Sequence, residues 1–486
     1  MRKINPRFCM KIKSRLSFLA LAWLTFSAFN PQSNTVFAQG SLAPTGAPAP
    51  AMKSLQQVEP RTDVLTLSGN ANVQFIISQS GSYYLTTNIT GVASKNGISI
   101  QADNVTLDLN GFTLFGGVTN SQAGISVNGA HVALAIRNGI VRDWPGNGIA
   151  AASASDSEFE QLRITANSGL GMKVGNHNLL ADCAVVTNGG DGIDAGANCG
   201  LASCVVVSNL NGISTGSGCN LRDCTVNYNS VQGIVTGNNC LLTQSVAVYN
   251  INTEINMGNY CTLKDCNAVG GGPGSPSCII MGNGCTMKDC TASACFNNGI
   301  TVGTNCTLLS CTATANTGNA DIYTGDGCVI KDCNAALSYY GFDTGDSCAI
   351  AGCSATDNFY GIGPGASSSV IGCNASSNLY YGISVAGSTL VKDNTTSSND
   401  NGGFYASGSG NRIEGNLSAN DNTGISVQGT ENLIFHNTVT GAAISYGIIS
   451  GNMVGGIASP PTSGAIVGSS GGAGLGTTDA WANFSY

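Results

Sequence analysis

The sequence of 486 residues is poor in charged and aromatic side chains and contains only three histidines. Charged residues make up 9% of the chain and aromatic residues 7%. Helix-favouring blocks of Ala, Glu, Lys and Leu are scarce, which excludes a helical bundle. His131, His177 and His436 lie too far apart to form a cluster, and none has an evident Ser-His-Asp partner set. The 66 glycines instead suit a chain of turns and short strands.

Most of the 20 cysteines recur at a fixed spacing. Successive C-x₄-C pairs lie 20 to 24 residues apart, and a period of this length indicates stacked supersecondary units rather than a globular core. Near the C-terminus Asn takes both columns, so these are stacking positions. The seven pairs are Cys199/Cys204, Cys219/Cys224, Cys261/Cys266, Cys285/Cys290, Cys306/Cys311, Cys328/Cys333 and Cys348/Cys353.

A second marker, Gly-Ile or a close variant, extends the period beyond the cysteines. It gives 13 clear and 4 weaker repeats, 17 in all, from Gly97-Ile98 to Gly447-Ile448. Within a repeat the apolar residues alternate, as Cys306 and Leu308 do, which is the period of a strand. The sequence therefore predicts an all-β, single-stranded parallel β-helix, one solenoid of about 17 coils.

Several segments resemble known repeats. Residues 80–85 and 104–112 look like the first coils of secreted bacterial right-handed parallel β-helix proteins, and residues 410–416 and 431–437 resemble NosD-type repeats of the pectin-lyase-like superfamily. The resemblance covers roughly residues 65–455 and implies a right-handed coil. Because that superfamily includes lyases, hydrolases, epimerases and adhesins, it implies the fold rather than an activity.

The motifs by which related β-helices cleave polysaccharides are missing from the sequence. Such proteins use paired aspartates, or a calcium cluster with an arginine. This chain has no Asp-Asp, Gly-His-Gly or Arg-Ile-Lys segment, which argues against pectin hydrolysis. No catalytic residue can be assigned from the sequence.

The N-terminus has the order of an export signal. Basic residues from Arg2 to Arg15 precede an apolar stretch over residues 16–29, and Ala38 offers a cleavage site before Gln39. A short membrane anchor is the alternative. We expect a signal peptide over residues 1–38, a Pro/Ala-rich linker over 39–64, the β-helix over 65–455, and a Gly/Ser-rich C-terminal tail or cap over 456–486.

Removal of the signal makes the chain strongly acidic. Residues 1–38 hold six of the 19 basic residues and none of the 27 acidic ones, so the mature chain has a net charge of −14. An acidic surface repels nucleic acids and anionic membranes. We expect a secreted, periplasmic or cell-surface monomer with no membrane span after cleavage and no nucleic-acid partner.

The cysteines outside the signal are expected to be buried thiols, for the most part reduced. Stacked parallel neighbours hold their Cβ atoms about 4.8 Å apart, whereas a disulfide prefers about 3.8 Å. Zinc binding is the alternative, but C-x₄-C repeats without histidine fit zinc spacings poorly. We expect neither a metal site nor a cofactor from these columns.

One aromatic cluster departs from the repeat. Just before the Gly-Ile marker, where earlier coils have polar residues, three consecutive coils have Tyr340, Tyr360 and Tyr381. We expect this column to face water and the column before it (Tyr339, Phe359, Tyr380) to be half buried. The nearby acids are Asp326, Asp343 and Asp346, which together with the three tyrosines form the candidate carbohydrate site. Alternatives are an aromatic ladder that only stabilises the sheet, and a calcium site between the three acids.

The sequence thus favours an exported, non-catalytic β-helix protein that binds a polysaccharide or cell-envelope glycan along this tyrosine strip. One alternative is a polysaccharide lyase, epimerase or hydrolase with catalytic residues outside recognised motifs. Another is a purely structural surface rod.

Overall fold

The computed structural model describes residues 59–117, 122–460, 463–469 and 478–486. Met1–Val58 is a unit separate from Glu59–Tyr486, so the predicted signal peptide and most of the predicted linker lie outside the described residues. In the described ranges the single helical element is a 3-10 turn, η1 (Val64–Thr66), and all other elements are strands. No helix found there is long and apolar enough to cross a bilayer.

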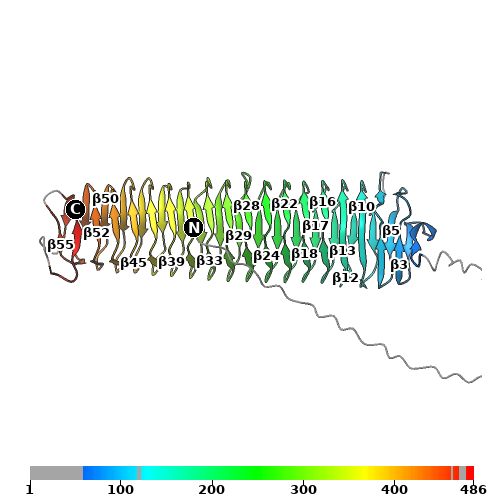
Figure 1. Ribbon diagram of the computed structural model, residues 1–486, viewed down its shortest axis with the longest axis horizontal. Helices are drawn as coiled ribbons and strands as arrows, with labels where there is room; N and C mark the ends of the chain where they lie inside the picture. Colours follow the sequence, from blue (N-terminus) through cyan, green and yellow to red (C-terminus); the bar gives the residue numbers. More distant parts are fainter. Residues whose placement is uncertain (1–58, 118–121, 461–462, 470–477) are drawn as a thin grey trace, which may run out of the picture. The chain divides into compact units, whose positions relative to one another are not determined.

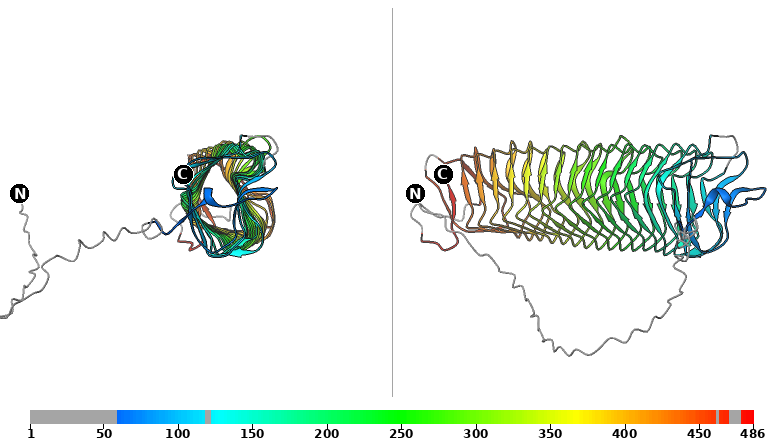
Figure 2. Two further views of the ribbon diagram at one scale, coloured as in Figure 1. Left: turned by 90° about the vertical axis from the view of Figure 1, so that its right-hand side faces the viewer. Right: turned by 45° about the vertical axis from the view of Figure 1, so that its right-hand side comes forward.

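The described residues from Glu59 to Tyr486 form a right-handed parallel β-helix in which a typical coil contributes one short strand to each of three faces (Figure 1). Each strand pairs in parallel with its counterpart one coil along, so the faces are continuous from end to end (Figure 2). The first face has nineteen strands: β2 (Val73–Ile77), β5 (Asn96–Ile100), β8 (Ile125–Val127), β11 (Ile149–Ala151), β14 (Met172–Val174), β17 (Ile193–Ala195), β20 (Ile213–Thr215), β23 (Ile234–Thr236), β26 (Ile255–Met257), β29 (Ser277–Met281), β32 (Asn298–Val302), β35 (Ala320–Thr324), β38 (Tyr340–Thr344), β41 (Tyr360–Gly363), β44 (Tyr381–Val385), β47 (Gly402–Ala406), β50 (Thr423–Val427), β53 (Ile444–Ile448) and β56 (Ala465–Gly468).

The other two faces are built of three-residue strands separated by one sharp bend. Nearer the N-terminus the long strands β10 (Ala135–Arg142) and β13 (Glu158–Thr165) each cross both faces. The second face contains β15 (Leu179–Ala181), β18 (Gly200–Ala202), β21 (Asn220–Arg222), β24 (Leu241–Thr243), β27 (Thr262–Lys264), β30 (Thr286–Lys288), β33 (Thr307–Leu309), β36 (Val329–Lys331), β39 (Ala349–Ala351), β42 (Ser369–Ile371), β45 (Leu390–Lys392), β48 (Arg412–Glu414) and β51 (Leu433–Phe435). The third face contains β16 (Ala184–Val186), β19 (Val205–Val207), β22 (Thr225–Asn227), β25 (Val246–Val248), β28 (Asn267–Val269), β31 (Thr291–Ser293), β34 (Thr312–Thr314), β37 (Asn334–Ala336), β40 (Ser354–Thr356), β43 (Asn374–Ser376), β46 (Thr395–Ser397), β49 (Leu417–Ala419) and β52 (Thr438–Thr440).

The coil prediction is confirmed and extended. All 17 predicted repeats correspond to strands of the first face, and the structure adds β2 before them and β56 after them, two strands that lack the Gly-Ile marker. The last marker is misplaced by two residues, because Tyr446, not Ile448, pairs with Ile425 and is fully buried in the core. The predicted alternation also holds: Leu308 and Cys306 are buried, whereas Thr307 between them is half-exposed.

The two cysteine columns line the bends on the inner side. The backbone N–H of Cys285 donates to Sγ of Cys306, one coil along, at 3.4 Å, and Sγ of Cys306 lies 3.2 Å from the carbonyl of Gly282. Ser368 accepts the same bond from Cys348 at 3.0 Å, and Asn394 accepts it from Cys373 at 2.8 Å. The columns therefore accept Cys, Ser or Asn because each offers a small buried acceptor for the backbone N–H of the preceding coil.

All 17 cysteines in these columns are free and buried. One disulfide that the sequence did not predict joins Cys278 and Cys295 inside the solenoid. It does not link neighbours of one column; instead it joins the first face to the bend after the third, beside the enlarged coil around residues 270–277. Its Cα atoms are 5.8 Å apart, which is within the normal range for a disulfide.

A third inner column is made of asparagines and ends in buried carboxylates. Asn188, for example, donates from its backbone N–H and its Nδ2 to Oδ1 of Asn209, at 2.9 Å each. Glu254 accepts the last bonds of this run from Asn250, and Asp321 accepts from Asn316 at 2.6 Å. Burial raises the pKa of Glu254 and of Asp321 to about 7.

The C-terminal residues close the last coil. Strand β57 (Asn483–Ser485) pairs with β52 and with β55 (Ile457–Ala458), and Oδ1 of Asn483 accepts from Nδ2 of Asn437 at 3.1 Å. Trp481 stacks on His436 with ring centroids 5.8 Å apart, at the side of the final coils. The tail therefore supplies partners for the exposed end of the solenoid, which stacked repeats require.

Candidate functional site

The aromatic cluster lies where β38, β41 and β44 begin on the first face. Tyr340 and Tyr360 stack with centroids 4.7 Å apart and an interplanar angle of 11°. In the preceding column Phe359 stacks on Tyr339 at 4.9 Å and on Tyr380 at 5.6 Å. Parallel in-register pairing holds neighbouring coils close enough for such ladders to form.

The first column is more buried than expected and the second more exposed, except for Phe359, which is half-buried as expected. Tyr340, Tyr360 and Tyr381 are half-buried, whereas Tyr339 is 46% exposed and Tyr380 36% exposed. Tyr340 and Tyr381 lean over the next coil: Cδ1 of Tyr340 would lie 3.9 Å from a Cβ placed on Gly363, and Cδ1 of Tyr381 3.3 Å from one placed on Gly402. Because stacked rings cover each other's faces, a ligand meets mainly ring edges and hydroxyl groups within the ladder.

The ladder opens between Tyr360 and Tyr381. Their centroids are 6.4 Å apart and the rings are tilted by 40°, while Tyr381 stacks in the opposite direction on Tyr405 at 4.3 Å and 2°. Gly363, whose place in the repeat points outward from the first face, has no side chain to fill the surface beside this opening. The result is a pocket of about 460 Å³, here called the Gly363 pocket.

The walls of the Gly363 pocket combine ring edges with a few polar groups. Asp343 lies one coil before Gly363 in the same outward row, and Ser384 and Tyr405 lie in the coils after it. Tyr340, Tyr360 and Tyr381 line one side, and Pro364 and Ala386 line the pocket as well. None of the lining residues is basic, and Asp343 is the one carboxylate among them.

Burial tunes the titratable groups of this pocket toward their neutral forms. Burial raises the pKa of Asp343, although Nδ2 of Asn319 donates to its Oδ2 at 3.2 Å. Burial also raises the pKa of Tyr340, and it raises that of Tyr381 to about 12. The phenols therefore stay protonated at neutral pH, so the pocket offers hydroxyl donors and carboxyl acceptors beside apolar ring edges.

Asp326 and Asp346 are exposed and do not line the pocket. Oδ1 of Asp326 accepts the backbone N–H of Asp346 at 2.8 Å, and Oδ1 of Asp346 accepts that of Ala366 at 2.8 Å. Asn283 does the same for Thr304 in an earlier coil. Both acids therefore continue a row of turn residues, and no group of three His, Cys, Asp or Glu in the described ranges is placed to hold a metal ion.

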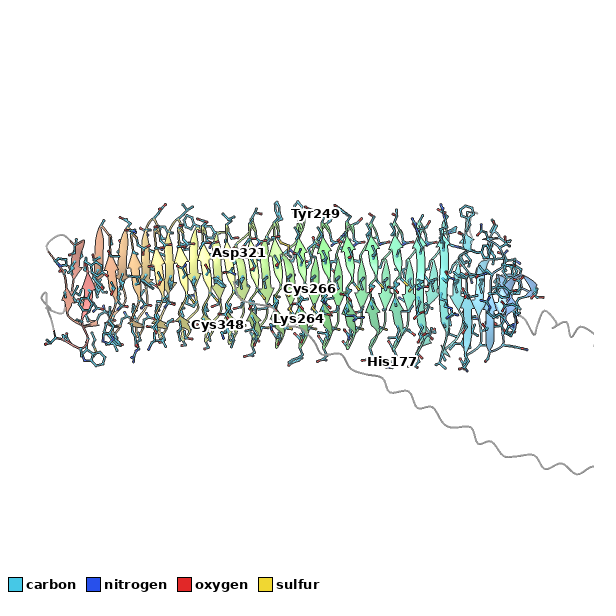
Figure 3. All side chains as sticks on the ribbon, viewed as in Figure 1. His177, Tyr249, Lys264, Cys266, Asp321 and Cys348 are labelled. Atoms are coloured by element: carbon cyan, nitrogen blue, oxygen red, sulfur yellow. A yellow bond between two sulfur atoms is a disulfide. The ribbon has the colours of Figure 1, made fainter. Side chains whose placement is uncertain are left out.

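The remaining candidates stay apart from the pocket. His131 contacts Asp103 at 2.9 Å near the N-terminal coils, and His177 lies at an edge of the solenoid (Figure 3). Lys264 pairs with Asp265 at 3.1 Å on the second face, in a row of similar exposed pairs. Sequence reasoning missed Gly363 and Tyr405; the signal for Gly363 was a second glycine directly after the Gly361-Ile362 marker, where most coils have a side chain.

Two family models match parts of the chain. The model described as periplasmic copper-binding protein (NosD) matches residues 296–455, and the model described as right handed beta helix region matches residues 66–221. No curated protein matches the chain.

The solved structures with a similar backbone have low sequence identity to this chain. The catalytic domain of an α-1,3-glucanase in complex with tetrasaccharides shares 11% identity over 68% of this chain, with a TM-score of 0.34. The Dettilon tailspike protein shares 14% over 77%, with a TM-score of 0.23. The chain spans 63% of the length of each of these two.

The A-module of a mannuronan C-5 epimerase from Azotobacter vinelandii shares 11% identity over 75% of this chain and 91% of that module, with a TM-score of 0.27. None of these likenesses supports an argument about activity. The coil geometry and the two family matches agree with the resemblance found in the sequence: the chain is a right-handed parallel β-helix, and its residues 296–455 are similar to the NosD model.

Proposed function

We propose that this chain is an exported extracellular or cell-surface protein that binds a neutral polysaccharide in the Gly363 pocket without cleaving it. The observation that carries the proposal is the opening of the tyrosine ladder over Gly363, between Asp343 and Tyr405. Sugar rings present apolar faces and many hydroxyl groups, and the pocket offers aromatic surface beside hydroxyl and carboxyl partners.

A neutral glycan fits this pocket better than a polyanionic one. Its lining contains Asp343 and no Lys or Arg, and the mature chain has a net charge of −14. A uronate-rich chain would therefore meet like charge without a cation to neutralise it. The pocket extends over several coils of the first face, which suits an elongated chain that lies along the strand rows.

An enzymatic role is the second candidate, and Asp343 is the observation that favours it. A carboxyl group with a raised pKa beside tyrosine hydroxyls could serve as a general acid or base in a lyase or epimerase. Hydrolysis by the usual mechanisms takes a pair of carboxylates flanking the bond, and the pocket lining has one. We therefore favour binding, and an assay for unsaturated or epimerised products distinguishes the two.

The description of the matching NosD model names copper, which raises the question of whether this chain can hold it. No group of three His, Cys, Asp or Glu in the described ranges is arranged for a metal ion. The inner thiols are buried, and Cys306 exemplifies how their sulfur atoms are engaged with backbone groups. These residues do not fit a copper site.

The proposal is tested with a glycan-array screen of the mature chain and the variant Gly363→Leu. A Cβ on Gly363 would meet only the Phe342 carbonyl at 3.6 Å and the Tyr340 ring at 3.9 Å, so the substitution fills the pocket without straining the coil. Gly274→Leu is the matched control, since a Cβ there meets nothing within 4 Å. We expect Gly363→Leu to lose neutral-glycan binding and Gly274→Leu to keep it.

Gly363→Leu tests binding more directly than replacement of the tyrosines does, because it leaves the aromatic ladder in place. Because Tyr340, Tyr360 and Tyr381 are half-buried and stacked, replacing all three by Ala would lower stability whether or not a glycan binds there. Equal binding by Gly363→Leu and wild type, or no glycan bound by either, would overturn the proposal. In the second case a structural rod would describe the protein best.

A further inference from the structure

The third face carries no charged side chain over thirteen consecutive coils, from β16 to β52. Each of its strands points its first and third residues outward and buries the second, as in Thr312, Ala313 and Thr314. Every outward position holds Ala, Val, Leu, Thr, Ser or Asn, and all are exposed or half-exposed. The pairing is in register throughout, as between β31 and β34, so this face is an even sheet surface.

This absence of charge is peculiar to the third face. The first face presents Lys173 and Asp194, which pair at 2.8 Å, and the second presents a row that includes Arg222, Lys264 and Lys288. With a mature net charge of −14, two copies of this chain repel one another over most of their surface. In the described coils from β16 to β52, the strands of the third face can approach those of a second copy without placing charged side chains opposite each other, and the charged residues lie at its border.

The N-terminal half of this face is also apolar. Valine occupies most outward positions from β16 to β28, and Val205 is 41% exposed. At the bend beside these valines, Tyr228 and Tyr249 stack 5.6 Å apart while remaining 58% and 51% exposed; Tyr249 lies at the edge of the solenoid (Figure 3). Exposed contiguous apolar surface of this kind marks protein–protein contacts, where tyrosine is enriched.

We propose that the third face is the interface of a homodimer, in which the faces of two copies pack sheet against sheet. Thirteen strands spaced about 4.8 Å apart, each about 10 Å wide, give a surface of roughly 600 Å² per copy. Two copies together bury roughly 1,200 Å², which reaches the range of specific interfaces. Small outward side chains let two such sheets approach to about 10 Å, as in β-sandwiches.

The two rods run antiparallel. Just before the uncharged region, Arg142 and Arg163 point outward from β10 and β13 in the same rows. A parallel pair would place these arginines against those of the second copy, whereas a two-fold axis perpendicular to the rod separates them. The third face then contacts itself, as a closed two-fold dimer requires, with the valine-rich half of each copy against the Thr-, Ser- and Asn-rich half of the other. This dimer would replace the monomer expected from the sequence.

The test is sedimentation velocity of the mature chain over a concentration series, with one charge placed on the face. Val248 lies outward on β25 of the third face, and Val235 lies outward on β23 of the first face in the same coil. Val248→Lys and Val235→Lys therefore add the same charge to the same coil on different faces. Circular dichroism verifies that both variants fold, and Val248→Thr serves as a second, uncharged variant of the face.

We expect wild type, Val235→Lys and Val248→Thr to dimerise, and Val248→Lys to dissociate about 100-fold more readily, because each dimer gains two lysines in a dry contact. A wild type that stays monomeric at all concentrations would overturn the proposal. So would equal dimerisation of the two lysine variants, which would place the interface elsewhere. Equal weakening by both would also overturn it, since the effect would then follow net charge rather than this face.

Discussion

Asp321 gives the fold a pH dependence that a single substitution should remove. Its Oδ1 accepts from Asn316 at 2.6 Å and from the hydroxyl of Ser338 at 2.5 Å, whereas its buried Oδ2 has no hydrogen-bond partner. The side chain is fully buried within the solenoid (Figure 3). Burial therefore disfavours the carboxylate and raises its pKa to about 7.

The size of the effect follows from this shift. In the unfolded chain Asp321 titrates near its ordinary value of about 3.9, so between that value and about 7 the folded state binds a proton that the unfolded state does not. The contribution of Asp321 to the free energy of unfolding is therefore fully present below about pH 4 and is lost as the pH rises through about 7. A shift of roughly three units at about 1.4 kcal/mol per unit makes the loss about 4 kcal/mol.

Urea unfolding of the wild type and Asp321→Asn between pH 4.5 and 8.5 measures this loss. Asparagine keeps an acceptor for Asn316 and cannot ionise, so the variant should match the wild type near pH 4.5 and exceed it by several kcal/mol at pH 8.5. Glu254, whose pKa is also raised to about 7, leaves a smaller slope in the variant. Asp357→Asn, at an exposed bend, is the control and should parallel the wild type. Identical pH slopes for wild type and Asp321→Asn would refute the reasoning.

Two further predictions concern the thiols and the export signal. Cys306→Ser should keep the wild-type stability within about 1 kcal/mol, whereas Cys306→Ala should lose about 1–3 kcal/mol in thermal or urea unfolding, because it leaves the buried N–H of Cys285 without an acceptor; equal losses would contradict the acceptor role. N-terminal sequencing of exported material should begin near Gln39, because the basic, apolar and small-residue segments stand in the order that signal peptidase reads; an intact Met1 would contradict this.

The repeat could be predicted from the sequence because its markers are buried in every coil. Residues such as Leu308 and Cys306 have one function, to fill and close the inside of the coil, so their spacing alone reveals the strands. The first and last strands of the first face could not be predicted in this way, because they lack the marker. β2 and β56 lie at the ends, where the capping environment replaces the Gly-Ile marker with other residues.

The candidate site could be predicted only in part. Sequence spacing brought Tyr340, Tyr360, Tyr381 and Asp343 to one patch, and all four line the Gly363 pocket. It could not give the direction in which the rings lean, because this depends on side-chain rotamers and on space in the next coil. Nor could it separate Asp343 from Asp326, since a turn residue and a pocket residue look alike until their hydrogen bonds are known.

The central claim is that a neutral glycan occupies the Gly363 pocket, and a crystal structure of the mature chain with the best-bound oligosaccharide tests it most directly. The account predicts sugar density over Gly363, between the carboxyl group of Asp343 and the ring of Tyr405, with hydroxyl groups in hydrogen-bond reach of Asp343. Density on another face, or an empty Gly363 pocket at saturating oligosaccharide, would contradict it.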